Sequence, residues 1–561
     1  MRHLRRLGHC LVAGALCGAL LAPLQLLLWP ELRASAGGAL LALGAWASWG
    51  ALWAGIAAFL VVEAVGVFVP LVAARRGFSL ALWWPLALAS GLSVASIAWW
   101  NRDQTHELLV ADHRDALSTA MAIALLLAVA AGITGRTAAA RRRPLLWSTV
   151  PAIAALVAVW TVWASSTPSV PPPMPPRAAT LPLPRKVLLV SWEGADLTWL
   201  LPAMEQGDMP FLRSRRDRGA WGQLRTSQPY SRTAFFATLV SSCPPSIHGV
   251  IGRRAYRVPW LSETPVSLLL AGPWPIPHHL PWRAWERAAP PPSRRAQLWE
   301  ILARAGLRVG VAGWPGMVRA TWVVAQPIAA EATPFSALSA DLRTALEPPL
   351  AAFPELAAPT RTAFAIASDV ATASQQRLAS TPVEALVSNT DLAARVRPLW
   401  TFDEPAGPQT EVLRTAARFL DAQIKREWEA LGGDEVLLAV VSPYGLSPPS
   451  AWRRLWSSPA QRSRWRVSPA GVPDGFILLA GPGVKEGVRL RGARLADVTA
   501  TMLYLLELPV ARDMSGRVLL DAVSDERAAS VPLRLIPSYG PPERQGTGDR
   551  GPGADARQPE R

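Results

Sequence analysis

Cysteine, histidine and lysine are scarce in this sequence of 561 residues, and each scarcity excludes a class of protein. The three cysteines, Cys10, Cys17 and Cys243, are too few for a disulfide framework or a cysteine-based metal cluster. None of the seven histidines lies between residues 280 and 561. Arginine supplies nearly all of the basic charge behind the net +16, as in proteins encoded by GC-rich bacterial genomes. Because no basic stripe is interleaved with aromatic residues, we expect no nucleic-acid partner.

Apolar residues, by contrast, are abundant in the first 164 positions, where five long stretches occur. Each is long enough for a membrane span, which needs about 20 apolar residues. Arginines precede the first stretch and follow the second and fourth, whereas the loop after the third is acidic, so the N-terminus is predicted to be cytoplasmic. We therefore predict a five-helix transmembrane domain over residues 1–164 in a bacterial inner (cytoplasmic) membrane, with the following chain in the periplasm. The stretches are 10–29, 39–73, 78–100, 115–135 and 145–164.

Two features of this membrane region leave alternatives open. The stretch 39–73 is long enough to cross the membrane once or twice, and one tilted crossing is the preferred interpretation. Glu63 falls within it, and an acid inside a span is a functional candidate. A hydrogen bond to a neighbouring helix is nevertheless the preferred interpretation of Glu63. If the spans carry the function instead, the protein is a membrane assembly or transport component and its periplasmic part is a scaffold.

Composition divides the remaining chain into three parts. Residues 165–185, SSTPSVPPPMPPRAATLPLPR, predict an extended, semi-rigid proline-rich linker. Residues 186–535 have the composition of a folded domain, and residues 536–561 that of a disordered tail. Within the folded part, strand-like runs such as KVLLVSW and GFILLAG alternate with helix-like runs such as LADVTATMLYLLELP. This alternation predicts an α/β domain with a mainly parallel sheet flanked by helices.

An ordered set of segments in this domain is similar to a known family. The segments KVLLVSWEGAD, PPSIHGV, LWEILARAGLRVGVAGWPG and DGFILLAGPGVKEG resemble the type I phosphodiesterase/nucleotide pyrophosphatase (sulfatase-like) branch of the alkaline phosphatase superfamily. The resemblance covers about residues 186–525. Membrane spans ahead of such a domain also resemble the layout of phosphoethanolamine transferases and lipoteichoic acid synthases. The resemblance implies an alkaline-phosphatase-like fold, cleavage of phosphate esters, a Thr or Ser nucleophile, and two zinc ions that stabilise the attacking and leaving oxygens.

The zinc ligands that the resemblance implies are largely replaced in this chain. Glu193 stands at the position of an aspartate ligand, and Asp391 is kept at another. Arg395 stands where the histidine partner of Asp391 is expected, and a guanidinium donates hydrogen bonds but cannot coordinate zinc; it could act as a counterion of Asp391. Pro443 and Tyr444 replace the Asp and His of a further ligand pair. We therefore expect Glu193 and Asp391 to be vestigial ligand positions, with no metal cofactor retained.

The nucleophile position is altered as well. In the family, the nucleophile lies nine residues before a Thr-Gly pair that precedes a PxxHG turn. Counting back from the turn PPSIHG places that pair at Ser241 and Ser242 and the nucleophile at Arg232. Ser231 and Thr233 flank Arg232 and are candidate catalytic hydroxyls. A hydroxyl without a metal or base beside it is an ordinary Ser or Thr, which is the preferred interpretation.

These replacements lead to one functional prediction and one alternative. We predict a membrane-anchored pseudoenzyme whose periplasmic domain binds a partner or serves as a scaffold at the cell envelope. Arg232 and Arg395 would line an anion pocket, because arginine forks suit phosphate and carboxylate groups. Besides the bilayer, the expected partners are an anionic lipid head group, an envelope polysaccharide or a partner protein. The alternative is an active phosphodiesterase, sulfatase-like hydrolase or phosphoethanolamine-type transferase with a remodelled site that uses Ser231 or Thr233.

Overall fold

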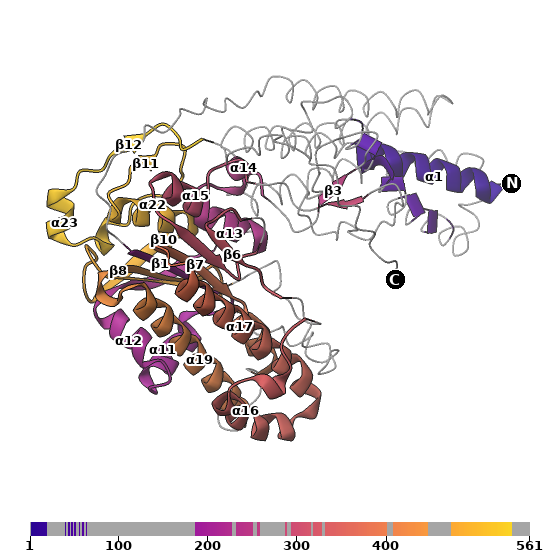
Figure 1. The fold of residues 1–561 in the computed structure, drawn as a ribbon. Helices are drawn as coiled ribbons and strands as arrows, with labels where there is room; N and C mark the ends of the chain where they lie inside the picture. Colours follow the sequence, from indigo (N-terminus) through magenta and orange to yellow (C-terminus); the bar gives the residue numbers. More distant parts are fainter. Residues whose placement is uncertain are drawn as a thin grey trace, which may run out of the picture.

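The computed structural model of the chain describes an α/β domain between residues 186 and 540, together with parts of the N-terminal region (Figure 1). We use the name α/β domain for the described residues from 186 to 540. The described ranges are 2–19, scattered positions from 40 to 63, 186–226, 232–250, 255–257, 286–288, 293–315, 318–327, 331–400, 408–446 and 473–540.

An eight-stranded sheet forms the centre of the α/β domain. Its strands are β1 Lys186–Trp192, β2 Gly219–Arg225, β5 Val309–Ala312, β6 Trp322–Val324, β7 Ala385–Thr390, β8 Val436–Ser442, β9 Gly475–Ala480 and β10 Val488–Arg494. They lie in the order β10-β2-β9-β8-β1-β7-β5-β6, and β9 pairs antiparallel with both of its neighbours while the other pairs are parallel. Every residue of β8 and β9 is buried, because both faces of the sheet are covered. The prediction of a mainly parallel sheet is confirmed.

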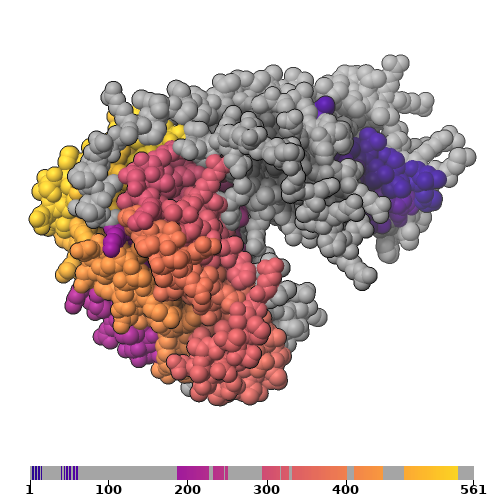
Figure 2. Space-filling view, viewed as in Figure 1, coloured from indigo at the N-terminus to yellow at the C-terminus, as the bar shows by residue number. Residues whose placement is uncertain are grey.

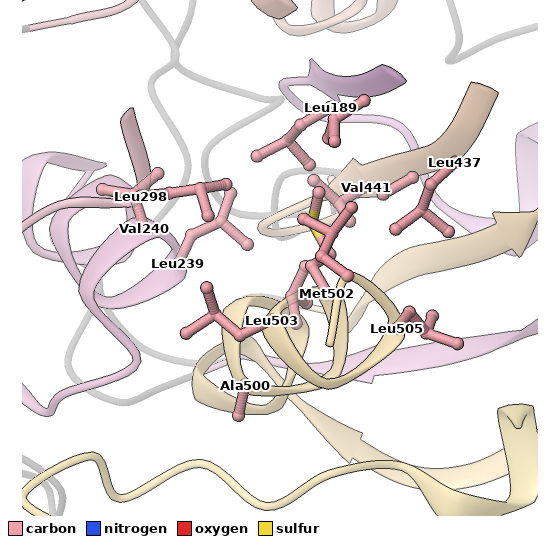
Figure 3. Packing of buried hydrophobic residues seen from close by; sticks show 14 of the residues in the cluster. Leu189, Leu239, Val240, Leu298, Leu437, Val441, Ala500, Met502, Leu503 and Leu505 are labelled. Atoms are coloured by element: carbon pink, nitrogen blue, oxygen red, sulfur yellow. The ribbon is translucent and has the colours of Figure 1, made fainter. Parts of the chain in front are cut away.

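Helices cover the sheet on both faces and create two hydrophobic cores (Figure 1). The helices are α11 Leu197–Glu205, α12 Pro210–Asp217, α13 Arg232–Ser241, α14 Pro245–His248, α15 Leu298–Arg304, α16 Ala340–Ala352, α17 Pro354–Ser380, α18 Leu392–Trp400, α19 Pro408–Leu431, α22 Leu495–Leu505 and α23 Asp525–Ser530. In the first core, Leu239 of α13 and Met502 of α22 lie near Leu189 and Val441 of the sheet (Figure 3). Helices α11, α12, α17, α18 and α19 build the second core on the opposite face. In the space-filling view, α16 and α17 form the surface at one end of the domain (Figure 2).

Three central strands end at the same edge of the sheet, and this edge positions the candidate site. The parallel register pairs Trp192 of β1 with Thr390 of β7, and Ser191 of β1 with Val441 of β8. The residues that follow these strands, Glu193 among them, therefore leave the sheet side by side. Loops at the carboxyl ends of strands are the usual ligand-binding positions of open α/β sheets.

The C-terminal part of the domain folds further than predicted. Its short elements, with those of the other loops, are β3 Ala255–Arg257, β4 Glu286–Ala288, β11 Val510–Ala511, β12 Leu535–Ile536, η2 Phe335–Ala337, η3 Gly433–Glu435 and η4 Leu520–Ala522. We expect disorder from residue 536 onwards, but β12 pairs with β11, and the buried Tyr539 donates its hydroxyl to the Pro509 carbonyl (2.5 Å). These contacts extend the folded region to residue 540. The rest of the predicted tail, 541–561, lies outside the described residues.

The N-terminal region is described only in part. Helix α1 spans Arg2–Ala19, and Nδ1 of His3 lies 2.9 Å from Oε2 of Glu63, so Glu63 does contact a neighbouring helix. Within the described residues, no helix combines the length and the apolar character that a membrane crossing requires. The described residues therefore do not support the five-span prediction. The stretches 10–29 and 39–73 are described in part, and the stretches 78–100, 115–135 and 145–164 and the linker 165–185 lie outside the described residues.

Candidate functional site

Glu193 is the first residue after β1, and hydrogen-bond donors surround its buried carboxylate, which is 1% exposed. Arg232 donates from Nε to Oε2 (2.5 Å) and from Nη2 to Oε1. The Tyr444 hydroxyl donates to Oε2 (2.9 Å), and Nδ2 of Asn389 donates to Oε1 (3.1 Å). Each carboxylate oxygen thus accepts two hydrogen bonds. The negative charge of Glu193 is therefore compensated, and its main acceptor positions are occupied.

Arg232 is the first residue of α13, and its guanidinium meets Glu193 in the two-point geometry that a planar fork and a carboxylate favour. The guanidinium carbon also lies 5.7 Å from the centre of the Phe236 ring. Burial by itself lowers the pKa of Arg232, but the charge and the hydrogen bonds of Glu193 outweigh this effect and raise the pKa above its ordinary value. Arg232 is therefore a fixed positive charge at the edge of the sheet.

The backbone of Ser242, shortly after α13, adopts an unusual conformation. Ser242 was counted as the glycine of the family's Thr-Gly pair. Its φ angle is 57°, in the left-handed region that favours glycine. The hydroxyl of Ser242 donates to the Ala496 carbonyl (2.5 Å), and its own carbonyl accepts the N–H of Ser515 (2.9 Å). These bonds hold a serine in a conformation for which glycine is the usual residue.

Asp391 follows β7 directly and is held by a second set of donors. Nη2 of Arg395, one turn later on α18, lies 2.8 Å from Oδ2. Nε2 of Gln326 donates to Oδ1 (2.8 Å), and Nη2 of Arg232 lies 3.9 Å from Oδ2. Two carboxylates and two guanidinium groups thus meet at this edge, and their formal charges cancel. Arg395 is placed as a counterion of Asp391.

Tyr444 and Pro443 lie in the loop after β8, where the sequence resemblance implies two zinc ligands. The Tyr444 ring is buried against Phe235 of α13, with ring centres 5.9 Å apart, and its hydroxyl reaches Glu193. The carbonyl of Pro443 accepts a hydrogen bond from the Thr226 hydroxyl (3.0 Å). Neither residue supplies a carboxylate or an imidazole, and both have structural partners within the domain.

The residues gathered at this edge do not fit a two-zinc centre. Zinc in proteins is bound by thiolate, imidazole or carboxylate groups, and here only Glu193 and Asp391 belong to those types. Protein donors already occupy both carboxylates, and an arginine nitrogen offers no electron pair to a metal. Across the described ranges, His, Cys, Asp and Glu side chains form no group of three or more that could hold a metal ion. We therefore assign no catalytic step to zinc in this domain.

Of the two candidate catalytic hydroxyls, one can be located. Ser231 lies outside the described residues. Thr233 is half-buried in the first turn of α13, directly after Arg232. The residue from this segment that the structure brings to the Glu193 carboxylate is Arg232.

His248 in the turn PPSIHG has a structural role. It is fully buried, its Nδ1 accepts the backbone N–H of Val250 (3.0 Å), and its Nε2 lies 3.0 Å from the hydroxyl oxygen of Thr238. Burial and the nearby charge of Arg294 lower the pKa of His248 to about 3, so the imidazole is neutral at physiological pH. Because both ring nitrogens are engaged inside the domain, His248 is unsuited to act as a general base.

Two residues of the site were not identified from the sequence. Asn389 belongs to β7 and lies two positions before Asp391, which follows the strand directly. The period of two along a strand turns side chains two positions apart to the same side, and this is the signal that could have found Asn389. Gln326 follows β6 and belongs to no motif, so only the packing of β6 against β5, which in turn pairs with β7, brings it to Asp391.

The α/β domain is similar to a family of phosphate-ester hydrolases. Residues 187–455 match the model of the family described as type I phosphodiesterase / nucleotide pyrophosphatase. The matched residues include Glu193, Arg232, Asp391 and Tyr444. No curated protein sequence matches the chain.

The solved structures that resemble this chain are distant in sequence. An inactive variant of murine ectonucleotide pyrophosphatase / phosphodiesterase 5, in complex with AMP, is 14% identical with a TM-score of 0.37, and the match covers 61% of this chain and 100% of that one. A putative sulfatase from Bacteroides thetaiotaomicron is 13% identical with a TM-score of 0.37, covering 60% of this chain and 73% of that one. A phosphonate monoester hydrolase from Silicibacter pomeroyi is 12% identical with a TM-score of 0.34, covering 61% and 78%.

Proposed function

We propose that the α/β domain is a phosphodiesterase-like pseudoenzyme that binds a partner or serves as a scaffold and does not hydrolyse phosphate esters. The observation that carries this proposal is the set of four hydrogen bonds that Glu193 accepts from Arg232, Tyr444 and Asn389. In a two-metal hydrolase, carboxylates give their electron pairs to cations that stabilise the reacting oxygens. In this domain, protein donors engage those electron pairs.

The strength of these contacts supports the proposal. Two-point arginine–carboxylate pairs are among the strongest polar contacts in proteins. A metal ion at Glu193 would have to displace Arg232, and the displaced guanidinium would lose its partner in a mostly buried position. Breaking a buried ion pair typically costs about 3–5 kcal/mol. The site is thus better suited to keep its own cation than to exchange it for zinc.

Arg395 is the group at this site that is best placed to meet an anionic partner. Its side chain is 39% exposed, whereas that of Arg232 is 14% exposed and donates from two nitrogens to Glu193. In the proposed anion pocket, Arg395 would contact the ligand and Arg232 would contribute only its charge. An anionic lipid head group, a polysaccharide phosphate or an acidic loop of a partner protein would supply the matching charge.

We further propose that the domain acts at the periplasmic side of a bacterial inner membrane, anchored by the first 164 residues. The support for this location is the set of apolar stretches and the distribution of arginine between them. The proline-rich segment 165–185 would then hold the domain away from the bilayer.

The experiment that tests the proposal uses purified full-length protein in detergent. We expect no stoichiometric zinc by elemental analysis, and no hydrolysis of bis-(4-nitrophenyl) phosphate that depends on added Zn²⁺ or Mg²⁺. Ser231→Ala and Thr233→Ala variants should be indistinguishable from the unmodified protein in this assay.

The opposite result would favour the alternative of an active hydrolase or phosphoethanolamine-type transferase. Tightly bound zinc with turnover that disappears in Ser231→Ala or Thr233→Ala would show that one of these hydroxyls is a nucleophile. The pseudoenzyme proposal would then be abandoned.

A further inference from the structure

We propose that Glu193, Asp391 and Asn389 form a binding site for a planar guanidinium cation, and that the chain fills this site with its own Arg232. The inference rests on the proposed function, because it makes the guanidinium the permanent occupant of a position where the family holds metal. It names the class of ligand that the site binds and identifies Arg232 as the ligand within the chain. It also predicts that free guanidinium cations bind when Arg232 is removed, which the loss of hydrolysis alone does not predict.

The guanidinium of Arg232 is shared between the two carboxylates. Its Nε and Nη2 donate to the two oxygens of Glu193, and Nη2 also lies 3.9 Å from Oδ2 of Asp391. Glu193 therefore binds the cation by a two-point hydrogen bond, and Asp391 attracts it by charge. Nδ2 of Asn389 donates to Oε1 of Glu193 and to the Gly313 carbonyl, which orients the carboxylate toward the fork.

The walls of the site come from separate elements of the fold. Glu193 follows β1, Asn389 belongs to β7, and Tyr444 follows β8, while the Phe236 ring of α13 lies 5.7 Å from the guanidinium carbon. Each of the three polar side chains is almost completely buried. A cation held here is largely removed from water, which strengthens its interaction with carboxylates and with an aromatic ring.

The arrangement favours a planar fork over a spherical ion. Tyr444 and Asn389 each donate a hydrogen bond to one oxygen of Glu193. Each oxygen accepts its second hydrogen bond from one of two neighbouring N–H groups of the Arg232 guanidinium. A divalent metal would have to compete with these donors, and among the described residues its only charged ligands would be Glu193 and Asp391. Oδ1 of Asn389 is buried without a hydrogen-bond partner in the part of the chain that the structure describes, but one neutral oxygen does not complete a metal site.

The test removes the intramolecular ligand and offers a free one. In full-length protein, Arg232→Ala should lower the unfolding temperature by about 5–10 °C, because a buried charge loses its partner. Methylguanidinium chloride at concentrations well below those that denature should raise the unfolding temperature of this variant along a saturating curve. The unmodified protein should show no such rise, because its site is occupied.

Matched variants separate binding at this site from a general effect of salt. The double variant Arg232→Ala/Glu193→Gln lacks both charges, so it should be less destabilised than the single variant and should not respond to methylguanidinium. Arg308→Ala breaks an exposed arginine–carboxylate pair with Glu384 (2.6 Å). This control variant should show neither the large drop in unfolding temperature nor a stabilisation by methylguanidinium. Arg232→Lys keeps the positive charge without the fork, and it should still unfold at a lower temperature than the unmodified protein.

Several outcomes would overturn the inference. These are an unchanged unfolding temperature in Arg232→Ala, an equal response of the single and double variants to methylguanidinium, or full stability of Arg232→Lys. Stabilisation of Arg232→Ala by Zn²⁺ and not by methylguanidinium would show that the site prefers a metal ion to a guanidinium cation. The proposed function is tested separately on the unmodified protein, so inactivity without guanidinium rescue would refute only the guanidinium site.

Discussion

Tyr444 illustrates how a single side chain changes the chemistry of this sheet edge. A histidine at this position would offer a nitrogen electron pair to a metal, whereas the phenol donates a proton to Oε2 of Glu193 (2.9 Å). The ring also fills space against Phe235, so the residue contributes to the hydrophobic core as well as to the hydrogen-bond network. Tyr444 therefore stabilises this edge of the sheet through both its ring and its hydroxyl.

The variant Tyr444→Phe measures the worth of that hydrogen bond. The ring keeps its packing, so the variant should lose only the bond to the carboxylate, about 2 kcal/mol in the free energy of unfolding. Urea denaturation of full-length protein with matched buffers would give this difference. A control, Tyr504→Phe, removes a hydroxyl that donates to a neutral carbonyl, that of Val531 (2.7 Å), and should cost less. Equal losses in the two variants would argue against a charge-assisted bond at Glu193.

The spacing of residues decided which contacts of the site could be anticipated. Arg395 lies four positions after Asp391, within one helical turn, so its role as a counterion could be inferred from local geometry. Arg232 and Glu193 are 39 positions apart, and their pairing depends on how α13 packs at the end of β1. The sequence did not reveal that the guanidinium of Arg232 donates to Glu193.

At the scale of elements, α12 shows a helix start that is stabilised from outside its own segment. The N-cap residue of α12, Met209, forms no side-chain hydrogen bond to the helix. Instead, the carboxylate of Asp421 on α19 accepts the backbone N–H groups of Phe211 (3.0 Å) and Leu212 (2.7 Å). Two otherwise unpaired N–H groups of the first turn are thereby satisfied.

Asp421→Ala should therefore destabilise the contact between α12 and α19. The expected loss is about 1–2 kcal/mol, as for removal of a helix cap, measured as a lower midpoint of urea unfolding. Asp421→Asn retains one acceptor oxygen and should lose less. If the two substitutions cost the same, or if neither lowers the midpoint, the cap has no energetic role.

Other elements show where sequence patterns were and were not sufficient. The alternation of strands and helices predicted the mainly parallel sheet, but it did not reveal that β9 runs antiparallel to β8 and β2. Strand direction within a buried sheet leaves no mark in an apolar run, because both faces are covered in either direction. Helices α16 and α17 contain Pro348, Pro349 and Pro359. Because proline disfavours the interior of a helix, the sequence pattern did not predict either helix.

At the scale of the whole domain, buried acids give its stability a dependence on pH. Glu427 of α19 is fully buried, and it accepts hydrogen bonds from Ser388 (2.8 Å) and Gln423 (3.0 Å). Burial raises the pKa of Glu427, and it also raises the pKa values of Asp421 and Asp497. A group with a raised pKa in the folded state stabilises the fold below its ordinary pKa, and this contribution is lost as the pH rises through the folded value.

Glu427→Gln should remove the part of this dependence that belongs to Glu427. The neutral amide keeps the shape of the side chain, so the variant should be more stable than the unmodified protein at alkaline pH. The difference should shrink as the pH falls toward the ordinary pKa of a glutamate. Unfolding temperatures measured across this pH range provide the check, and Asp421 and Asp497 should leave a residual slope. Parallel curves for the two proteins would show that Glu427 does not titrate differently on folding.

The sequence by itself determined the α/β class and the mainly parallel sheet, because apolar periodicity is a local property of the chain. Only the tertiary structure decided that Arg232 meets Glu193, that Tyr444 and Asn389 complete its hydrogen bonds, and that Asp421 caps α12. These contacts join residues far apart in the chain, and their geometry depends on how helices and strands pack. The arrangement around Glu193 and Asp391 is therefore a property of the packed domain, whereas the scarcity of histidine can be counted from the sequence.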